Sequence, residues 1–182
     1  MHRFEIWAPL ARRMAVSVNG AALPMEGPDD QGCWRLELSE AGPGTDYGYL
    51  IDEDTTPYPD PRSQGQPNGV HGLSRVYDQN AFDWSDDSFQ ATPLASAIIY
   101  ELHVGTFTGS GTLDAAIAKL DYLAELGITH IELMPVAAFA GEHGWGYDGV
   151  ALYAVHQPYG APDALKRFVN RSEEHTSELQ SQ

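Results

Sequence analysis

Residues 97–134 decide the fold and read AIIYELHVGTFTGSGTLDAAIAKLDYLAELGITHIELM. The run 97–102 is short and apolar, which is typical of a buried strand. After a glycine-rich loop, Thr112 suits a helix N-cap, and Gly127 suits a left-handed C-terminal cap before a second apolar run at 128–134. Between the caps, apolar residues recur at intervals of three and four and define one helix face: Leu113, Ala116, Ile117, Leu120, Leu123 and Ala124. Strand, helix and strand at this spacing predict a parallel crossover unit.

The first 77 residues follow a different period. Apolar and polar residues alternate in the runs 4–6, 14–18, 34–38 and 47–51, which is typical of half-buried strands. Asn19-Gly20 is a strong signal for a two-residue hairpin turn. Residues 1–77 are therefore predicted to form a small β-sandwich.

The remaining chain divides into three predicted parts. Residues 78–95 look like a linker whose Phe82, Trp84 and Phe89 are candidates for packing on a neighbouring domain. Residues 96–169 hold the parallel unit and a further helix near Pro162, a residue well suited to the first helical position. A parallel sheet needs more strands than these and cover on both faces, so we expect a truncated domain.

Residues 170–182 read NRSEEHTSELQSQ and carry no apolar period. The string RSEEHTSELQS matches the translation of a common sequencing-adapter oligonucleotide. We therefore interpret this tail as non-native read-through and expect the globular sequence to end near Val169.

Composition excludes several classes of partner. Ten Lys and Arg stand against 26 Asp and Glu, a net charge of −16, which disfavours binding to nucleic acid or anionic membranes but is compatible with a neutral, hydroxyl-rich ligand. The single cysteine, Cys33, excludes an internal disulfide framework. No apolar run has the length of a signal peptide or a membrane span, so a soluble cytoplasmic protein is expected.

Several segments resemble the α-amylase superfamily of glycoside hydrolases. Residues 99–108 and 127–136 resemble its first and second barrel strands, and the loop 144–148 resembles the segment that leads to the second barrel helix. Upstream, 4–9 and 58–63 resemble the β-sandwich that precedes the barrel in branching, debranching and trehalose-releasing members. The resemblance runs in order from Phe4 to about Val169.

Two phrases, 130–136 and 143–150, bring the chain closest to the trehalose-releasing members. This resemblance implies an N-terminal β-sandwich followed by the start of an (α/β)8 TIM barrel, a fold of about 250 residues when complete. It also implies hydrolysis, without cofactor or metal, of the α-1,4 bond next to the terminal trehalose of malto-oligosyltrehalose, a step of trehalose biosynthesis. A 1,4-α-glucan branching or debranching enzyme is the alternative, with another α-glucan as substrate.

The catalytic groups of the superfamily are not expected within this chain. Retaining hydrolysis needs a carboxylate nucleophile and a carboxylic acid about 5 Å apart. In the family these groups lie on later strands, so the chain as written is predicted to have no hydrolytic activity. Glu101 and Glu132 are expected mid-strand, whereas barrel chemistry takes place at the carboxyl ends of strands, so we assign them a structural role with hydrogen bonds inside the barrel.

The resemblance points to four candidate substrate-binding residues: His143, Trp145, Tyr147 and Asp148. The ring of Tyr147 would cover the C–H face of a sugar, or else pack in the core. Trp145 would contact sugar or anchor the loop. Asp148 would accept a sugar hydroxyl or a backbone N–H, and His143 would line the cleft. The histidines lack the close pairing of a zinc site.

A hypothesis from another class is a non-catalytic α-glucan-binding module. Exposed Trp34, Tyr47 or Tyr49 could stack on sugar rings. Their alternation with polar residues argues that they face a core instead.

Overall fold

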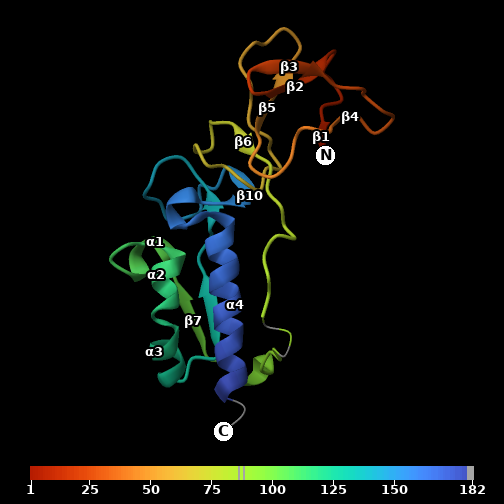
Figure 1. Ribbon diagram of the computed structural model, residues 1–182. Helices are drawn as coiled ribbons and strands as arrows, with labels where there is room; N and C mark the ends of the chain where they lie inside the picture. The colour runs from red at the N-terminus through yellow and green to blue at the C-terminus, as the bar shows by residue number, and fades with distance from the viewer. Residues whose placement is uncertain (86, 88, 180–182) are drawn as a thin grey trace.

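The computed structural model describes residues 1–85, 87 and 89–179. Two antiparallel sheets lie at one end of the molecule, and a parallel strand pair with its helices lies at the other (Figure 1). Within the described residues, no helix is both long and apolar enough to cross a membrane.

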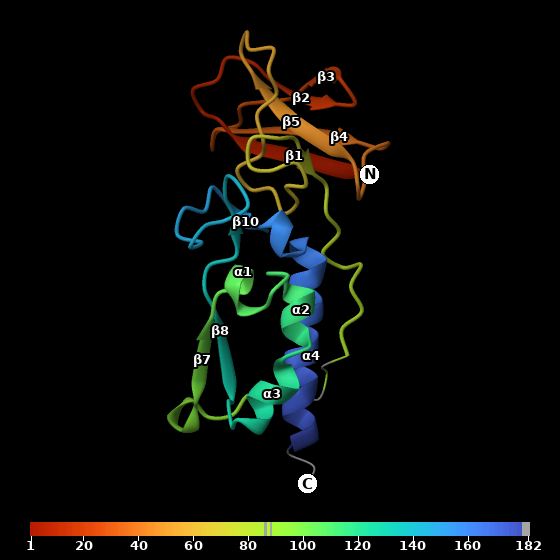
Figure 2. The ribbon, with the colours of Figure 1, turned by 90° about the vertical axis from the view of Figure 1, so that its left-hand side faces the viewer.

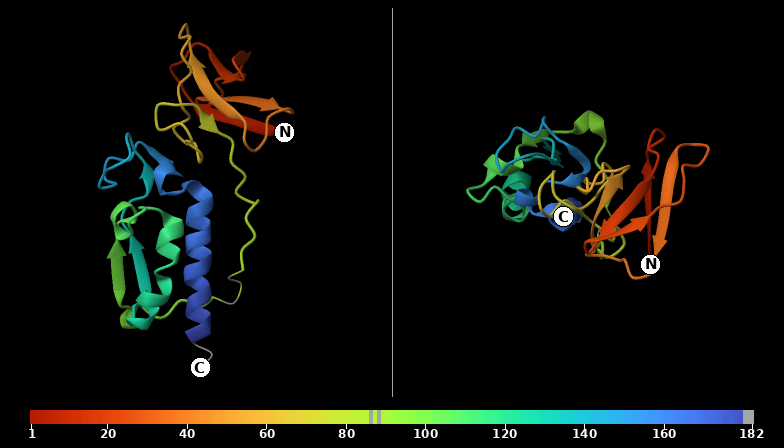
Figure 3. Two further views of the ribbon diagram at one scale, coloured as in Figure 1. Left: turned by 60° about the vertical axis from the view of Figure 1, so that its left-hand side comes forward. Right: turned by 90° about the horizontal axis from the view of Figure 1, so that it is seen from above.

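The amino-terminal sheets share one core (Figure 3). The smaller sheet pairs β1 (His2–Trp7) with β4 (Cys33–Leu38), and the larger has the order β3-β2-β5-β6. The strands of the larger sheet are β2 (Met14–Val18), β3 (Ala21–Pro24), β5 (Asp46–Ile51) and β6 (Ser74–Arg75). Phe4 and Trp34 of one sheet and Val16 and Tyr49 of the other are buried together, each at most 5% exposed. The two-residue alternation therefore directs one side of each sheet inward, as predicted.

The parallel unit of residues 97–134 is present. Strand β7 (Ile99–Leu102) pairs in parallel with β8 (His130–Leu133). The connection holds α1 (Val104–Phe107), α2 (Leu113–Ile117) and α3 (Leu120–Glu125), and α4 (Ala161–Leu179) packs beside α2 and α3 (Figure 2). The helices bury the apolar face that was predicted, with Leu113 and Ala116 fully enclosed.

Both predicted caps are confirmed. The Thr112 hydroxyl accepts a hydrogen bond from the Ala115 N–H at 3.2 Å. Gly127 has φ +89°, and the N–H groups of Gly127 and Ile128 bond to the carbonyls of Ala124 and Leu123 at 2.9 and 3.0 Å. This pair of bonds is the Schellman arrangement, which satisfies carbonyls left open at a helix end.

The structure departs from prediction both within the connection and after β8. The expected single helix is two helices, because the Lys119 N–H bonds to the Ala116 carbonyl three residues back and tightens the chain at Ala118. The stretch after β8 adds an antiparallel pair, β9 (Ala137–Ala138) and β10 (Ala151–Val155), which the alternation did not reveal. Two short 3-10 turns, Leu94–Ser96 and Gln157–Tyr159, complete the elements.

Residues 78–85 run alongside α4 (Figures 1 and 2). The Tyr77 hydroxyl donates to Asp163 at 2.6 Å, and the Lys166 ammonium donates to the Gln79 carbonyl at 2.7 Å. The same ammonium lies 5.0 Å from the centre of the Tyr77 ring. The linker is therefore attached to the helical part at its start, and Phe82 lies against Trp84 at 4.8 Å between ring centres.

Helix α4 continues beyond Val169 to Leu179, through part of the segment that is interpreted as read-through, and the origin of that segment stays a prediction. Arg171 and Glu174 form an ion pair at 3.2 Å, and the Asn170 amide donates to Glu174 at 3.1 Å. Side chains three and four residues apart stabilise a helix in this way, and extending an existing helix needs no new nucleus. A polar segment without apolar period can thus be helical when it continues a packed helix.

Candidate functional site

The loop 139–150 lies between β9 and β10 at the carboxyl ends of β7 and β8, close to α1 (Figure 2). In parallel α/β units, binding residues gather at this end of the strands. All four candidate substrate-binding residues belong to this loop.

Two glycines shape the loop through close backbone approaches. Gly146 is buried at φ +88°, and a Cβ there would lie 2.4 Å from the Pro135 carbonyl oxygen. A Cβ at Gly144 would lie 2.8 Å from the Phe139 ring. The loop is therefore pressed onto the end of β8 at Gly146 and onto Phe139 at Gly144.

The side chains beside Gly146 face solvent. Trp145 is 78% exposed and Tyr147 is 71% exposed, while His143 and Asp148 also lie on the surface. Neither ring packs in a core of the described residues, and the roles of Trp145 and Tyr147 as sugar contacts or as packing residues stay predictions. The loop instead holds two large rings in water, where flat faces are available to a ligand.

A buried aromatic cluster below the loop was not predicted. Phe139 stacks on His156 with ring centres 3.7 Å apart, and Tyr159 meets His156 edge-on at 4.8 Å. His103, directly after β7, donates its Nε2 proton to the Gly144 carbonyl at 2.8 Å and lies 3.3 Å from the Tyr159 hydroxyl. These residues are distant in sequence, so periodicity within one element could not have found them.

Electrostatics in this cluster follow from burial. Burial lowers the pKa of His156, against a smaller raising effect of its hydrogen bond to the Glu142 backbone and of the Asp148 charge. Burial also raises the pKa of Tyr159, and the Asp148 carboxylate adds to that effect. His156 and Tyr159 are therefore neutral near pH 7, and Nε2 of His156 has no hydrogen-bond partner among the described residues.

Glu101 and Glu132 lie opposite one another in the β7–β8 register. Both side chains are exposed. The residues that follow them, Leu102 and Leu133, instead pack into the core beneath the helices. Hydrogen bonds of these two side chains inside a complete barrel stay a prediction. Each glutamate is the third of the four residues of its strand.

The proposed sugar platforms of a binding module are not available. Trp34 and Tyr47 are each 5% exposed and Tyr49 is 1% exposed. Burial raises the pKa of the Tyr47 phenol, whose hydroxyl donates to Asp60 at 2.7 Å. These rings form the core of the two sheets, as the alternation predicted.

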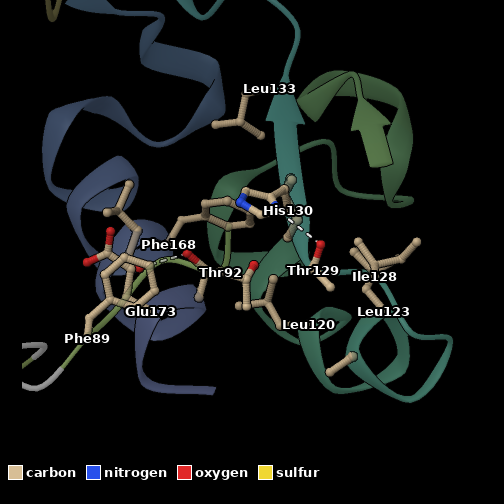
Figure 4. Close-up of a pocket in the computed structure, with 14 residues that line it drawn as sticks. Phe89, Thr92, Leu120, Leu123, Ile128, Thr129, His130, Leu133, Phe168 and Glu173 are labelled. Atoms are coloured by element: carbon tan, nitrogen blue, oxygen red, sulfur yellow. Dashed lines mark hydrogen bonds between the residues drawn. The ribbon is translucent and has the colours of Figure 1, made fainter. Parts of the chain in front are cut away.

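A separate hollow of about 440 Å³ lies along β8, between this strand and the helices α3 and α4 (Figure 4). Its walls include Leu120, Leu123, Leu133 and Phe168, with His130 and Thr129 at one side. This apolar lining does not resemble a site for a hydroxyl-rich ligand. In the described part of the chain, no three His, Cys, Asp or Glu side chains come together as metal ligands.

The sequence profile of the alpha-amylase catalytic domain matches residues 59–179. The chain belongs to the alpha-amylase family. A malto-oligosyltrehalose trehalohydrolase of Rhizobium sp. (strain M-11) is 52% identical over 173 residues, which are 92% of this chain and 29% of that protein. A 1,4-alpha-glucan branching enzyme of Xanthomonas euvesicatoria is 33% identical over 189 residues, covering 93% of this chain and 26% of the relative.

Solved structures of the family have the same fold. A putative alpha amylase from Salmonella typhimurium superposes with a TM-score of 0.90 at 43% identity, over 94% of this chain and 29% of that one. A pullulanase from Paenibacillus barengoltzii, in complex with maltohexaose and alpha-cyclodextrin, superposes with a TM-score of 0.69 at 25% identity. The match covers 94% of this chain and 34% of the pullulanase chain. The chain thus spans about a third or less of the length of the proteins that it matches.

Proposed function

We propose that this chain is part of a malto-oligosyltrehalose trehalohydrolase, which cleaves the α-1,4-glucosidic bond next to the terminal trehalose and releases trehalose. The observation that carries the proposal is the 52% identity to a trehalohydrolase over 92% of the chain, against 33% to a branching enzyme. In the complete enzyme, the two-sheet unit would be a domain of residues 1–77, and residues 96–169 would begin an (α/β)8 barrel.

The role of this chain would be to bind substrate. Tyr147 would cover the C–H face of a glucose ring, and Trp145 would offer a second flat surface two residues away. Asp148 would accept a sugar hydroxyl, and His143 would lie at the rim. The exposure of both rings at the carboxyl ends of β7 and β8 supports this arrangement.

The carboxylic acid and the carboxylate that cleave the bond are assigned to residues outside this chain. A retaining pair must flank the bond about 5 Å apart. Glu101 and Glu132 lie within β7 and β8, before the last residue of each strand, and neither belongs to the loop 139–150, which supports that assignment.

A chimera tests the proposal. Residues 1–169 would replace the matching segment of the Rhizobium sp. trehalohydrolase, and trehalose release from maltopentaosyltrehalose would be measured. We expect release by the chimera and none by the 182-residue chain alone. The control is the same replacement with the segment of the Xanthomonas branching enzyme. A folded chimera that branches amylose but releases no trehalose would favour the branching alternative.

Substitution of Tyr147 tests the platform in that chimera. Tyr147→Ala is expected to lower kcat/KM by about 10- to 100-fold, because stacking worth about 1.5–3 kcal/mol at the transition state is lost. The melting temperature should stay unchanged, since the ring is 71% exposed. Tyr122→Ala, which removes a ring 61% exposed on α3, is the matched control. Equal kcat/KM in both variants would dismiss the platform.

A further inference from the structure

We propose that His103 is a positioning residue, whose Nε2–H group holds the loop 139–150 so that Trp145 and Tyr147 stay presented at the carboxyl ends of β7 and β8. The proposal deepens the proposed function, because the rings that it positions are the suggested sugar platforms.

The first step of the argument is the place of His103. It follows β7 directly and is the N-cap residue of α1, so its backbone is set by a strand and a helix rather than by a loop. Its neighbour Gly105 packs closely, because a Cβ there would lie 3.0 Å from the imidazole and 3.1 Å from the Tyr159 ring. The imidazole is thus confined between the turn of α1 and Tyr159.

The second step is the proton on the ring. The Gly144 carbonyl can only accept, so the 2.8 Å contact requires hydrogen on Nε2. The Thr106 hydroxyl lies 3.4 Å from Nδ1. The Nε2–H group satisfies the contact with Gly144, and the Tyr159 hydroxyl oxygen, 3.3 Å from Nε2, can share the same proton as an acceptor.

The third step is what the bond restrains. Gly144 lies one residue before Trp145 and three before Tyr147, and Gly146 between the rings has φ +88°. The side chains of Trp145 and Tyr147 are exposed and make no core contact that would hold them. The tether to His103 acts together with the approach of Gly146 to Pro135 and with the bond from the Val150 N–H to the Ala138 carbonyl at 2.8 Å, and it is the contact nearest to Trp145 that a side chain makes through a hydrogen bond.

Hydrogen exchange of the 182-residue chain tests the tether without any assay of activity. His103→Met keeps the bulk and removes the N–H group, and His103→Asn places its amide near the Nδ1 position, too short to reach Gly144. His103→Gln places an amide N–H near the Nε2 position. Exchange of amides in 140–150 should accelerate about 5- to 10-fold in the Met and Asn variants and stay within about 2-fold in the Gln variant.

His130→Met is the matched control, because it makes the same chemical change at the amino end of β8, away from the loop. It should leave exchange in 140–150 unchanged. Equal acceleration by the Gln and Met variants, or none in the Met and Asn variants, would overturn the proposal. If the Met variant does not fold, the comparison of Gln with Asn decides, since both are amides.

The consequence for substrate is measured in the chimera described above. His103→Met should lower kcat/KM about 5- to 10-fold through a higher KM, and His103→Gln should restore it to within about 2-fold. A fall of kcat alone, with KM unchanged, would contradict positioning of a binding platform. An inactive parent chimera would count against the proposed function, while the exchange experiment would still decide the role of His103.

Discussion

At the scale of single residues, backbone geometry sets the shape of the loop 139–150. Gly146 and Gly141 have nearly the same φ, +88° and +89°, but only Gly146 has an atom where a Cβ would be. Gly141→Ala and Gly146→Ala should each lower the free energy of unfolding by about 1 kcal/mol, because alanine disfavours the left-handed conformation. Gly146→Ala should lose about 2 kcal/mol more through overlap with Pro135. Urea denaturation measures the difference, and equal losses would show that the loop moves aside without cost.

A second residue-scale feature is the carboxylate of Asp29, in the turn between β3 and β4. The Cys33 N–H donates to it at 2.9 Å, and the Arg35 guanidinium pairs with it. These bonds lower the pKa of Asp29 to about 2. A lowered pKa stabilises the folded state above the unfolded value near 4, and this contribution is lost as the pH falls toward 2.

The prediction that follows concerns acid unfolding. Asp29→Asn should reduce the stability at pH 7 and flatten the loss of stability between pH 4 and pH 2, because the variant has no carboxylate to protonate. Thermal unfolding over that pH range measures the slope. Asp30→Asn, one position along the same turn, is the control and should keep the wild-type slope. An unchanged slope in Asp29→Asn would contradict this assignment.

At the scale of elements, capping chemistry explains why the start of α2 and the end of α3 were predictable. Thr112→Ala removes the acceptor for the Ala115 N–H and should cost about 1 kcal/mol. Thr112→Ser keeps the hydroxyl and should cost much less. Chemical denaturation followed by circular dichroism compares the two. A similar loss in both variants would mean that the methyl group of Thr112, and not its hydroxyl, supports α2.

The sequence did not predict the elements that form through contacts between distant segments of the chain. The cap residues Thr112 and Gly127 act within four residues of themselves, so the sequence reveals them. Strand β10 exists because its backbone pairs with β9 across the loop 139–150, and its exposed Leu152 and Tyr153 break the two-residue alternation. Likewise, the polar end of α4 is helical because it continues a helix that packs on α2 and α3.

At the scale of the whole molecule, a small apolar cluster joins the two ends. Val70, from the segment before β6, is 3% exposed and packs with Ala138, Ala151 and Ala154 of the β9–β10 region. Val70→Ala removes two buried methyl groups and should cost about 1–2 kcal/mol. Val150→Ala makes the same change at a side chain 58% exposed and should cost almost nothing.

Hydrogen exchange in Val70→Ala shows which segments of the chain this cluster stabilises. Hydrogen exchange in Val70→Ala should accelerate both in 66–72 and in 151–154, because the cluster contains residues of both segments. Acceleration confined to 66–72 would show that the amino-terminal unit and the β9–β10 region are stabilised independently.

The sequence by itself determined the period of each segment, the caps of the helical connection and the position of the candidate loop. These properties depend on neighbours along the chain, and the candidate binding residues lie within one short stretch, His143 to Asp148. Only the tertiary structure decided which rings are exposed, because burial depends on what the rest of the chain covers: Trp34 is enclosed by a second sheet, whereas Trp145 is not. It also decided that His103 meets Gly144, 41 positions away, since the parallel crossover brings the ends of β7 and β8 together.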